Sequence, residues 1–229
     1  MSAVQLVECP RDAIQGWAHP VSTEDKIAYY KGLLEVGFHT LDLGSFVSHK
    51  AVPQMKDTRK VLQSLNDEGV FSSATNVLVI VANERGCREA VEYPSVKCIG
   101  FPLSVSPTFQ ERNTRATIDE AWRRLDVIAN HCRQHSKDLV VYLSMGFGNP
   151  YGDEWSTDIT VRFMERLMER VDPSVISIAD TIGAATPELV RAVFQIASDL
   201  VSTEKLGAHL HLHPLEGIDK IKAAHDGGC

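Results

Sequence analysis

Short apolar runs alternate along the chain with longer amphipathic stretches. Helical patterns of ten or more residues lie between most of the apolar runs. The runs 139–143 and 175–178 predict strands that are buried on both faces, as in a parallel sheet. The alternation therefore predicts β/α repeats with seven parallel strands, which we place at 4–8, 38–43, 75–82, 96–100, 138–145, 174–179 and 206–211.

Capping residues support the predicted helices. Ser22 precedes a helical pattern at 24–36, which Gly37 ends, and Thr186 precedes another at 187–201 that begins with proline. Serine and threonine accept hydrogen bonds from the first N–H groups of a helix, and glycine tolerates the left-handed conformation in which many helices end.

The element count favours an α/β fold of the (β/α)8 TIM barrel class, with seven of the eight strands present. A complete barrel typically needs about 250 residues, whereas this chain has 229 and reads as one domain over 1–229. After the seventh strand we expect one helix, at 215–225, and then the chain ends where an eighth strand should begin. We therefore expect a barrel that is incomplete at its C-terminus. A doubly wound open sheet is the alternative.

Composition narrows the class of protein. The net charge is −7 and the acidic and basic residues are interspersed, so no basic stripe for a nucleic-acid partner is present. No apolar stretch reaches the length that spans a membrane, and the strand-like run at 4–7 leaves no room for a targeting segment, so we expect a cytoplasmic protein. The five cysteines are widely spaced without a C-x-x-C pair, which favours reduced thiols.

Polar residues collect where the predicted strands end. Working residues of parallel α/β folds lie at the C-terminal ends of the strands, so residues from separate elements meet on one rim. The positions that share this placement are Arg11, Asp12, Asp42, Ser45, Asn83, Ser104, Ser106, Ser144, Asn149, Asp180, Thr181, His209 and His211. This gathering is the strongest sign of a functional site in the sequence.

Asp12, His209 and His211 form a candidate metal site. Side chains two apart in a strand share a face, so the two imidazoles point the same way. Two nitrogens and one carboxylate suit a divalent ion that keeps positions open for water or substrate oxygens. The alternative is a pair of histidines that hydrogen-bond to their neighbours. His213 continues the series, but Pro214 follows it, so we interpret it as a rim residue.

Arg11 and Asp42 are the candidate catalytic residues. Arg11 carries a permanent charge that suits an enolate or thioester oxygen, or it forms a salt bridge at the barrel mouth. Asp42 could position a substrate hydroxyl, remove its proton, or bond to the following loop. Asp180 could orient a metal histidine or Arg11. The glycines of the loop at 146–152 would let its N–H groups approach a ligand, although no Walker A pattern follows.

Several segments in order resemble the hydroxymethylglutaryl-CoA lyase family of metal-dependent TIM barrels. Residues 10–15, PRDAIQ, resemble the family's P-R-D-G-L-Q, and residues 45–55, SFVSHKAVPQM, resemble its S-F-V-S-P-K-W-V-P-Q-M. The D-T-I-G at 180–183 and the H-x-H at 209–211 complete the set. The similarity covers essentially the whole chain.

The resemblance implies a lyase that cleaves a 3-hydroxy-3-methylglutaryl thioester into acetyl-CoA and acetoacetate, a reaction of leucine degradation. Asp12, His209 and His211 would hold Mg²⁺ or Mn²⁺, Arg11 would stabilise the enolate, and an acyl-CoA would be the partner, with a possible homodimer. We assign to substrate binding the polar residues Gln15, Ser45, Lys50, Asn83, Ser144, Asp180 and Thr181.

Departures from the family pattern concern the acyl group and the end of the chain. Asp42 stands where the family has glutamate, His49 replaces a proline, Ser106-Pro107 lacks the family's carboxylate, and Leu212 replaces an aspartate. The family continues into strand eight, a glycine-rich loop with a catalytic cysteine, and an asparagine ligand. Cys229 falls too early to be that cysteine. We therefore expect a fragment with poor solubility and little activity.

Two alternatives remain open. One is an aldolase or acyl-CoA condensing enzyme of the same superfamily. The segment at 45–55 argues against this alternative, because it resembles the lyases. The other is a catalytically inactive, truncated binding protein.

Overall fold

The computed structural model describes residues 4–71, 74–213 and 217–229. Its residues fall into two compact units, which divide within β4, α6 and β5. Unit 1 comprises 1–100 and 131–138, and unit 2 comprises 101–130 and 139–229. No helix among the described residues combines the length and the apolar character that a membrane crossing requires.

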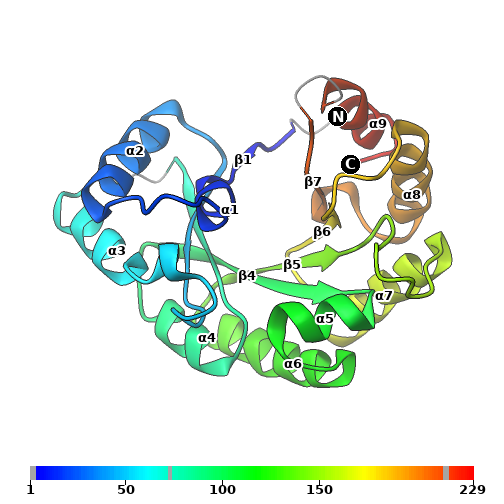
Figure 1. Ribbon diagram of the computed structural model, residues 1–229, viewed down its shortest axis with the longest axis horizontal. Coiled ribbons are helices and arrows are strands. Elements are labelled where there is room, and N and C mark those ends of the chain that lie inside the picture. Colours follow the sequence, from blue (N-terminus) through cyan, green and yellow to red (C-terminus); the bar gives the residue numbers. More distant parts are fainter. Residues whose placement is uncertain (1–3, 72–73, 214–216) are drawn as a thin grey trace. The chain divides into compact units, whose positions relative to one another are not determined.

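Unit 1 contains the first strands of a parallel sheet (Figure 1). Val7 pairs with Thr40, Thr40 pairs with Asn76, and Val77 pairs with Val96, each in parallel register. The elements are β1 (Val7–Glu8), α1 (Pro10–Gln15), α2 (Thr23–Val36), β2 (Thr40–Ser45), a 3-10 turn (Pro53–Met55), α3 (Thr58–Asp67), β3 (Asn76–Ile80), α4 (Glu84–Val91) and β4 (Val96–Ser104) as far as residue 100.

Unit 2 continues the same pattern of parallel strands and helices. Val140 pairs with Val175, and Ile176 pairs with Leu206. Helices α8 and α9 pack side by side (Figure 1). The elements after β4 are α5 (Pro107–Thr114), α6 (Ile118–Gln134), β5 (Asp138–Ser144), α7 (Thr157–Arg170), β6 (Val175–Asp180), α8 (Pro187–Leu200), a 3-10 turn (Thr203–Lys205), β7 (Leu206–Leu210) and α9 (Gly217–Asp226).

The strand order decides between the two predicted fold classes. In the described residues the seven strands follow one another in the sheet in chain order, from β1 to β7. A doubly wound sheet reverses its strand order at a switch point, whereas a β/α barrel adds each strand beside the previous one. The barrel topology is therefore confirmed and the doubly wound alternative is wrong.

The predicted caps are present. Ser22 accepts a hydrogen bond from the Asp25 N–H, and Gly37 adopts φ +81°, which ends α2. Thr186 accepts from the Leu189 N–H at the start of α8. These side chains satisfy N–H groups that have no partner inside their own helix.

Some strand predictions need correction. β1 covers only two of the five residues expected at 4–8, and Val4 and Leu6 before it are more than 60% exposed. β4 runs to Ser104, four residues beyond its predicted end. In β5 the exposure alternates, with Val140 and Tyr142 half-buried, so this strand is not buried on both faces.

The C-terminal helix and the cysteines agree with the sequence in part. α9 begins at Gly217, two residues after the predicted start at Leu215, which lies outside the described residues.

All five cysteines are free thiols, as predicted. Burial raises the pKa of the Cys9 thiol to about 12, with the nearby Asp42 adding to the effect, so Cys9 stays protonated at neutral pH.

Candidate functional site

In unit 1, Arg11 lies at the centre of a hydrogen-bonded network at the end of β1. Pro10 begins α1 directly after this strand, and its ring suits the first position of a helix, so Arg11 and Asp12 fall in the first turn. Arg11 is 7% exposed and Asp42, on β2, is fully buried. A permanent cation is held here because a carboxylate partner lies beside it.

Asp42 binds Arg11 through both of its oxygens. Arg11 Nε donates to Oδ1 and to Oδ2, each at 3.1 Å, and Nη2 donates to Oδ2 at 2.6 Å. This paired geometry fixes the plane of the guanidinium group. The sequence left three roles open for Asp42, none of which is this ion pair, but a salt bridge was the alternative role given for Arg11.

Gln15 ties the remaining side of Arg11 to Asp12. Arg11 Nη1 donates to Asp12 Oδ1 at 3.0 Å and to Gln15 Oε1 at 2.9 Å, and Gln15 Nε2 donates to Asp12 Oδ1 at 2.8 Å. Gln15 lies one helical turn beyond Arg11 in α1, so both face the same way. The candidate metal carboxylate Asp12 is thus oriented by its neighbours, with 21% of its side chain exposed.

In unit 2, His209 and His211 bring their ring nitrogens together. β7 ends at Leu210, so His211 lies one residue past the strand, and its N–H continues the pairing by donating to the Asp180 carbonyl at 3.3 Å. The two Nε2 atoms lie 3.2 Å apart. The predicted shared face is therefore confirmed. Tyr142 on β5 packs edge-on against the His209 ring.

The D-T-I-G turn after β6 supports the histidine backbone. Gly183 has φ +68°, and a Cβ there would approach the His211 carbonyl oxygen to 2.8 Å. A larger residue would push this turn away from His211. Thr181 Oγ1 accepts from the Met145 N–H at 2.9 Å, which ties the turn to the loop after β5.

The Asp180 carboxylate has a different role from the predicted one. It accepts from the N–H groups of Ala184 and Ala185 and pairs with Lys220 Nζ at 3.4 Å. It therefore holds its own loop and α9, and only its backbone carbonyl contacts a histidine. Sequence reasoning missed Lys220, although its spacing from Gly217, Ala223 and Ala224 puts it on the buried helix face.

The glycine-rich loop at 146–152 bonds to itself rather than presenting its N–H groups. Asn149 Oδ1 accepts from the N–H groups of Tyr151 and Asp153, and the Gly148 N–H donates to the Met145 carbonyl. Asp153 in turn accepts from Ser106 and Thr108 at the start of α5. The expected approach of this loop to a ligand is not supported.

The other predicted substrate residues divide into buried, capping and exposed positions. Ser45 and Ser144 end their strands and are 5% and 7% exposed. Asn83 caps α4 by accepting from the Gly86 N–H at 3.0 Å. The hydroxyl of Ser104, the last residue of β4, donates to the Ser144 carbonyl, and the hydroxyl of Ser106 donates to Asp153. Lys50 is exposed.

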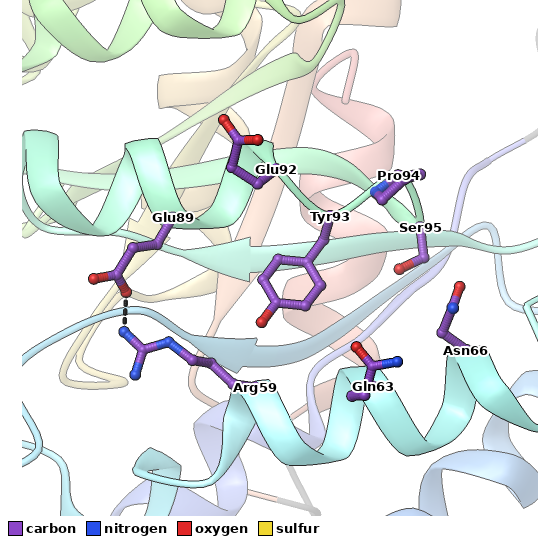
Figure 2. A pocket seen from close by; sticks show the side chains of 8 residues that line it. All are labelled: Arg59, Gln63, Asn66, Glu89, Glu92, Tyr93, Pro94 and Ser95. Carbon is purple, nitrogen blue, oxygen red and sulfur yellow. Dashed lines mark hydrogen bonds and ion pairs between the residues drawn. The ribbon is translucent and has the colours of Figure 1, made fainter.

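Two cavities in unit 1 differ in what lines them. One, of about 400 Å³, contains none of the predicted site residues and lies between α3, α4 and the residues that precede β4 (Figure 2). The other, of about 320 Å³, contains Ser45 and Lys50 at the end of β2. Only the second lies at the C-terminal end of a strand, where barrel enzymes bind their substrates.

Comparison with known proteins shows the family. The HMGL-like family model matches residues 3–219. The chain is 30% identical over 210 residues to a 3-hydroxy-3-isohexenylglutaryl-CoA/hydroxy-methylglutaryl-CoA lyase of Pseudomonas aeruginosa, which covers 91% of this chain and 68% of that protein. It is 30% identical to the hydroxymethylglutaryl-CoA lyase YngG of Bacillus subtilis, over 88% of this chain and 66% of that protein.

Solved structures of HMG-CoA lyases superimpose closely on this chain. The HMG-CoA lyase of Bacillus subtilis superimposes with a TM-score of 0.91 at 26% identity, over 98% of this chain and 74% of that one. An HMG-CoA lyase of Acinetobacter baumannii, in complex with coenzyme A and 3-methylmalate, superimposes with a TM-score of 0.90 at 26% identity, over 100% of this chain and 74% of that one.

Proposed function

This chain belongs to the HMGL-like family, and from that premise we propose that it is a divalent-metal-dependent carbon–carbon lyase acting on 3-hydroxy-3-methylglutaryl-CoA. The chain spans about two thirds of the length of the curated relatives it matches. Two arrangements carry the proposal: the Arg11 network within unit 1 and the two converging imidazoles within unit 2. The predicted lyase family is confirmed, and the relatives reported above do not favour a condensing enzyme or an inactive binding protein.

The donor groups fit a divalent ion. The Nε2 atoms of His209 and His211 lie 3.2 Å apart, so both imidazoles could offer a nitrogen to one divalent ion. We propose that these histidines and Asp12 hold Mg²⁺ or Mn²⁺, and the family is divalent-metal dependent in general. The ion would polarise the hydroxyl and carboxylate oxygens of the substrate.

The reaction breaks one carbon–carbon bond and forms no covalent enzyme intermediate. The proton of the 3-hydroxyl leaves, the bond between C2 and C3 breaks, and a new C=O bond forms in acetoacetate. The electron pair of the broken bond passes to the acetyl-CoA enolate, which takes up one proton. Negative charge thus develops on the thioester oxygen, and a fixed cation next to it lowers the barrier.

Arg11 is the residue that we propose for this stabilisation. Its guanidinium group is nearly fully buried, where charge interactions are stronger than in water, and three hydrogen bonds to Asp42 fix its orientation. Both oxygens of Asp42 already accept hydrogen bonds from Arg11. The geometry therefore favours Asp42 as the residue that positions Arg11 over a role in removing the proton.

The substrate-binding set stays a proposal. Ser45 has the strongest support, because its hydroxyl is buried, has no partner among the described residues and lines the 320 Å³ cavity. Asn83 and Thr181 already make the helix-cap and loop bonds described above. Gln15, Lys50, Ser144 and Asp180 complete the proposed set. A single domain, a cytoplasmic location, a homodimer and a place in leucine degradation stay predictions of the sequence.

A second acyl group is a candidate because of a named relative. The lyase of Pseudomonas aeruginosa is named for 3-hydroxy-3-isohexenylglutaryl-CoA as well as for the methyl compound. The two thioesters share the hydroxyl, carboxylate and CoA groups and differ only in the alkyl group on C3. The chemistry proposed above therefore applies to both.

An assay of acetyl-CoA release, the product that both thioesters would give, tests the proposal. The product of the complete coding region is incubated with 3-hydroxy-3-methylglutaryl-CoA and with its isohexenyl analogue, with Mn²⁺ or Mg²⁺ and after chelation. We expect turnover that chelation abolishes and that added metal restores. Metal binding without turnover of either thioester would overturn the proposal in favour of a binding protein.

A further inference from the structure

The helix α1 carries Arg11 and Asp12 but is too short to hold them in place by itself. It has six residues and follows a strand of two residues. Isolated helices shorter than about 12 residues are marginal in water, so contacts with other segments fix the position of α1. Within unit 1, the 3-10 turn Pro53–Met55 packs against α1. This turn comes after β2 in the chain.

Gln54, in this turn, holds the loop that leaves α1. Its Nε2 donates to the carbonyl oxygens of Trp17 at 3.0 Å and of His19 at 2.7 Å, and its Oε1 accepts from the Val21 N–H at 3.1 Å. The Trp17 N–H in turn donates to the Ile14 carbonyl at 3.0 Å, so the loop continues directly from the last turn of the helix. One half-buried side chain thus makes three hydrogen bonds, all to backbone groups of this loop.

A buried ion pair holds the backbone of Gln54. Lys26 on α2 is 3% exposed, and its Nζ donates to the Gln54 carbonyl oxygen and pairs with Asp57 at 2.7 Å. Asp57 also accepts from the Thr23 hydroxyl at 2.8 Å, at the start of α2. A buried lysine is stable only where its charge is paired and hydrogen-bonded. The turn is therefore fixed against α2.

Thr58, just after the turn, fixes the same segment to β2. Its Oγ1 accepts from the Ser45 N–H at 3.2 Å, and a Cβ on Gly44 would lie 2.6 Å from the Thr58 side chain. β2 is the strand that carries Asp42. The turn and the residues that follow it thus connect β2, α2 and the loop after α1.

We propose that Gln54 is a positioning residue for the cleavage reaction, because it holds α1 where Arg11 and Asp12 stay aligned with Asp42. The inference rests on the proposed function, in which Arg11 stabilises the enolate and Asp12 binds the metal. Gln54 acts through the backbone of the loop after α1 rather than through the substrate. Such a residue matters because a displacement of about 1 Å at a reacting group can cost about 100-fold in rate.

Gln54→Glu and Gln54→Met test this role in the product of the complete coding region. An ionised glutamate keeps an acceptor for the Val21 N–H but turns an oxygen toward the Trp17 and His19 carbonyl oxygens, and methionine loses all three bonds without adding charge. With saturating Mn²⁺, we expect kcat for 3-hydroxy-3-methylglutaryl-CoA to fall about 10- to 100-fold in both variants. KM should change by less than about threefold, because the loss concerns the orientation of reacting groups rather than uniform binding. A rise in KM with unchanged kcat would overturn the proposal.

Gln63→Glu is the matched control for Gln54→Glu. Gln63 is an exposed glutamine on α3 in the same unit, and its Nε2 donates to Asp67 at 2.6 Å (Figure 2 shows Gln63). The control change also removes a hydrogen bond and adds one negative charge. Its kcat should stay within about twofold of the parent value, as is usual for surface substitutions. A fall as large as that in Gln54→Glu would assign the effect to charge and overturn the proposal.

Hydrogen exchange tests the positioning separately from the reaction. If the parent cleaves no thioester, the proposed function fails, but exchange of the amides at 10–21 still reports how firmly α1 and its loop are held. By mass spectrometry we expect this segment to exchange at least about tenfold faster in the Gln54 variants, with β3 unchanged, because the lost bonds permit local opening. Equal protection of 10–21 in parent and variants would overturn the inference. Faster exchange in β3 as well would mark Gln54 as a residue of general stability and would also overturn it.

Discussion

The two candidate regions differ in how their polar groups are held. In unit 1, Arg11 and Asp42 are almost completely buried and joined by three hydrogen bonds. In unit 2, His209 is half-buried and His211 is exposed, and their rings meet at the end of a strand. The first arrangement fixes the direction of a charge, and the second presents nitrogen donors at a rim. In the proposed function the first arrangement stabilises the enolate and the second holds the metal.

Loss of the imidazoles should have the largest effect. In His209→Ala or His211→Ala we expect Mn²⁺ affinity to fall by at least about 100-fold and kcat/KM by about three orders of magnitude, because a donor to the ion is missing. Calorimetry with Mn²⁺ measures the affinity without turnover. His225→Ala, an exposed histidine on α9, is the control. Unchanged Mn²⁺ affinity in both variants would contradict the metal site.

Arg11→Gln should reduce kcat by about 10²–10³-fold, the usual effect of removing one group that stabilises an oxyanion. Mn²⁺ affinity should change far less than in the histidine variants, since Arg11 is not a ligand. Arg11→Lys should also lose most of the activity, because lysine lacks the planar donor pair that Asp42 accepts from. Full activity in Arg11→Lys would show that only the charge matters.

Asp42→Asn tests whether the carboxylate positions Arg11. The change leaves a buried arginine without its main carboxylate partner, so we expect a loss of about 3–5 kcal/mol in the free energy of unfolding. Chemical denaturation measures it. If Asp42 only positions Arg11, the pH dependence of kcat in the surviving folded enzyme keeps its shape. Loss of an ionisation from that profile would instead identify Asp42 as the base.

Asp153→Asn should have the smallest effect. Hydrogen bonds from Ser106 and Thr108 lower the pKa of Asp153 in the folded protein, so the ionised form stabilises the fold above its unfolded pKa, near 3.8, and this stabilisation is lost as the pH falls through the folded value. We expect Tm to drop by about 2–4 °C at pH 7. The variant and the parent should converge only below pH 3.8, as the pH falls through the lowered pKa of Asp153 in the folded protein. Equal Tm values at pH 7 would contradict the bond's contribution.

Sequence patterns identified most of the fold because the signals are local. Ser22 with Gly37, and Thr186 with the proline after it, determine where α2 and α8 begin or end through bonds within a single turn. The residues at which strands begin and end were harder to predict. Val4 and Leu6 are apolar residues of the first predicted strand, yet both are more than 60% exposed, because an apolar pattern does not determine which other segments cover a side chain.

The candidate site shows the same division between local and distant information. The sequence by itself determined the chemical types, an arginine and a carboxylate after the first strand and two histidines two residues apart after the last, since these follow from position in a repeating pattern. Only the tertiary structure decided what each residue contacts. Asp42 binds Arg11, Asp180 binds Lys220, and Lys56 and Arg85 line the same cavity. These partners lie tens of residues apart in the chain, and only folding of the strands and helices brings them within hydrogen-bonding distance or onto one surface.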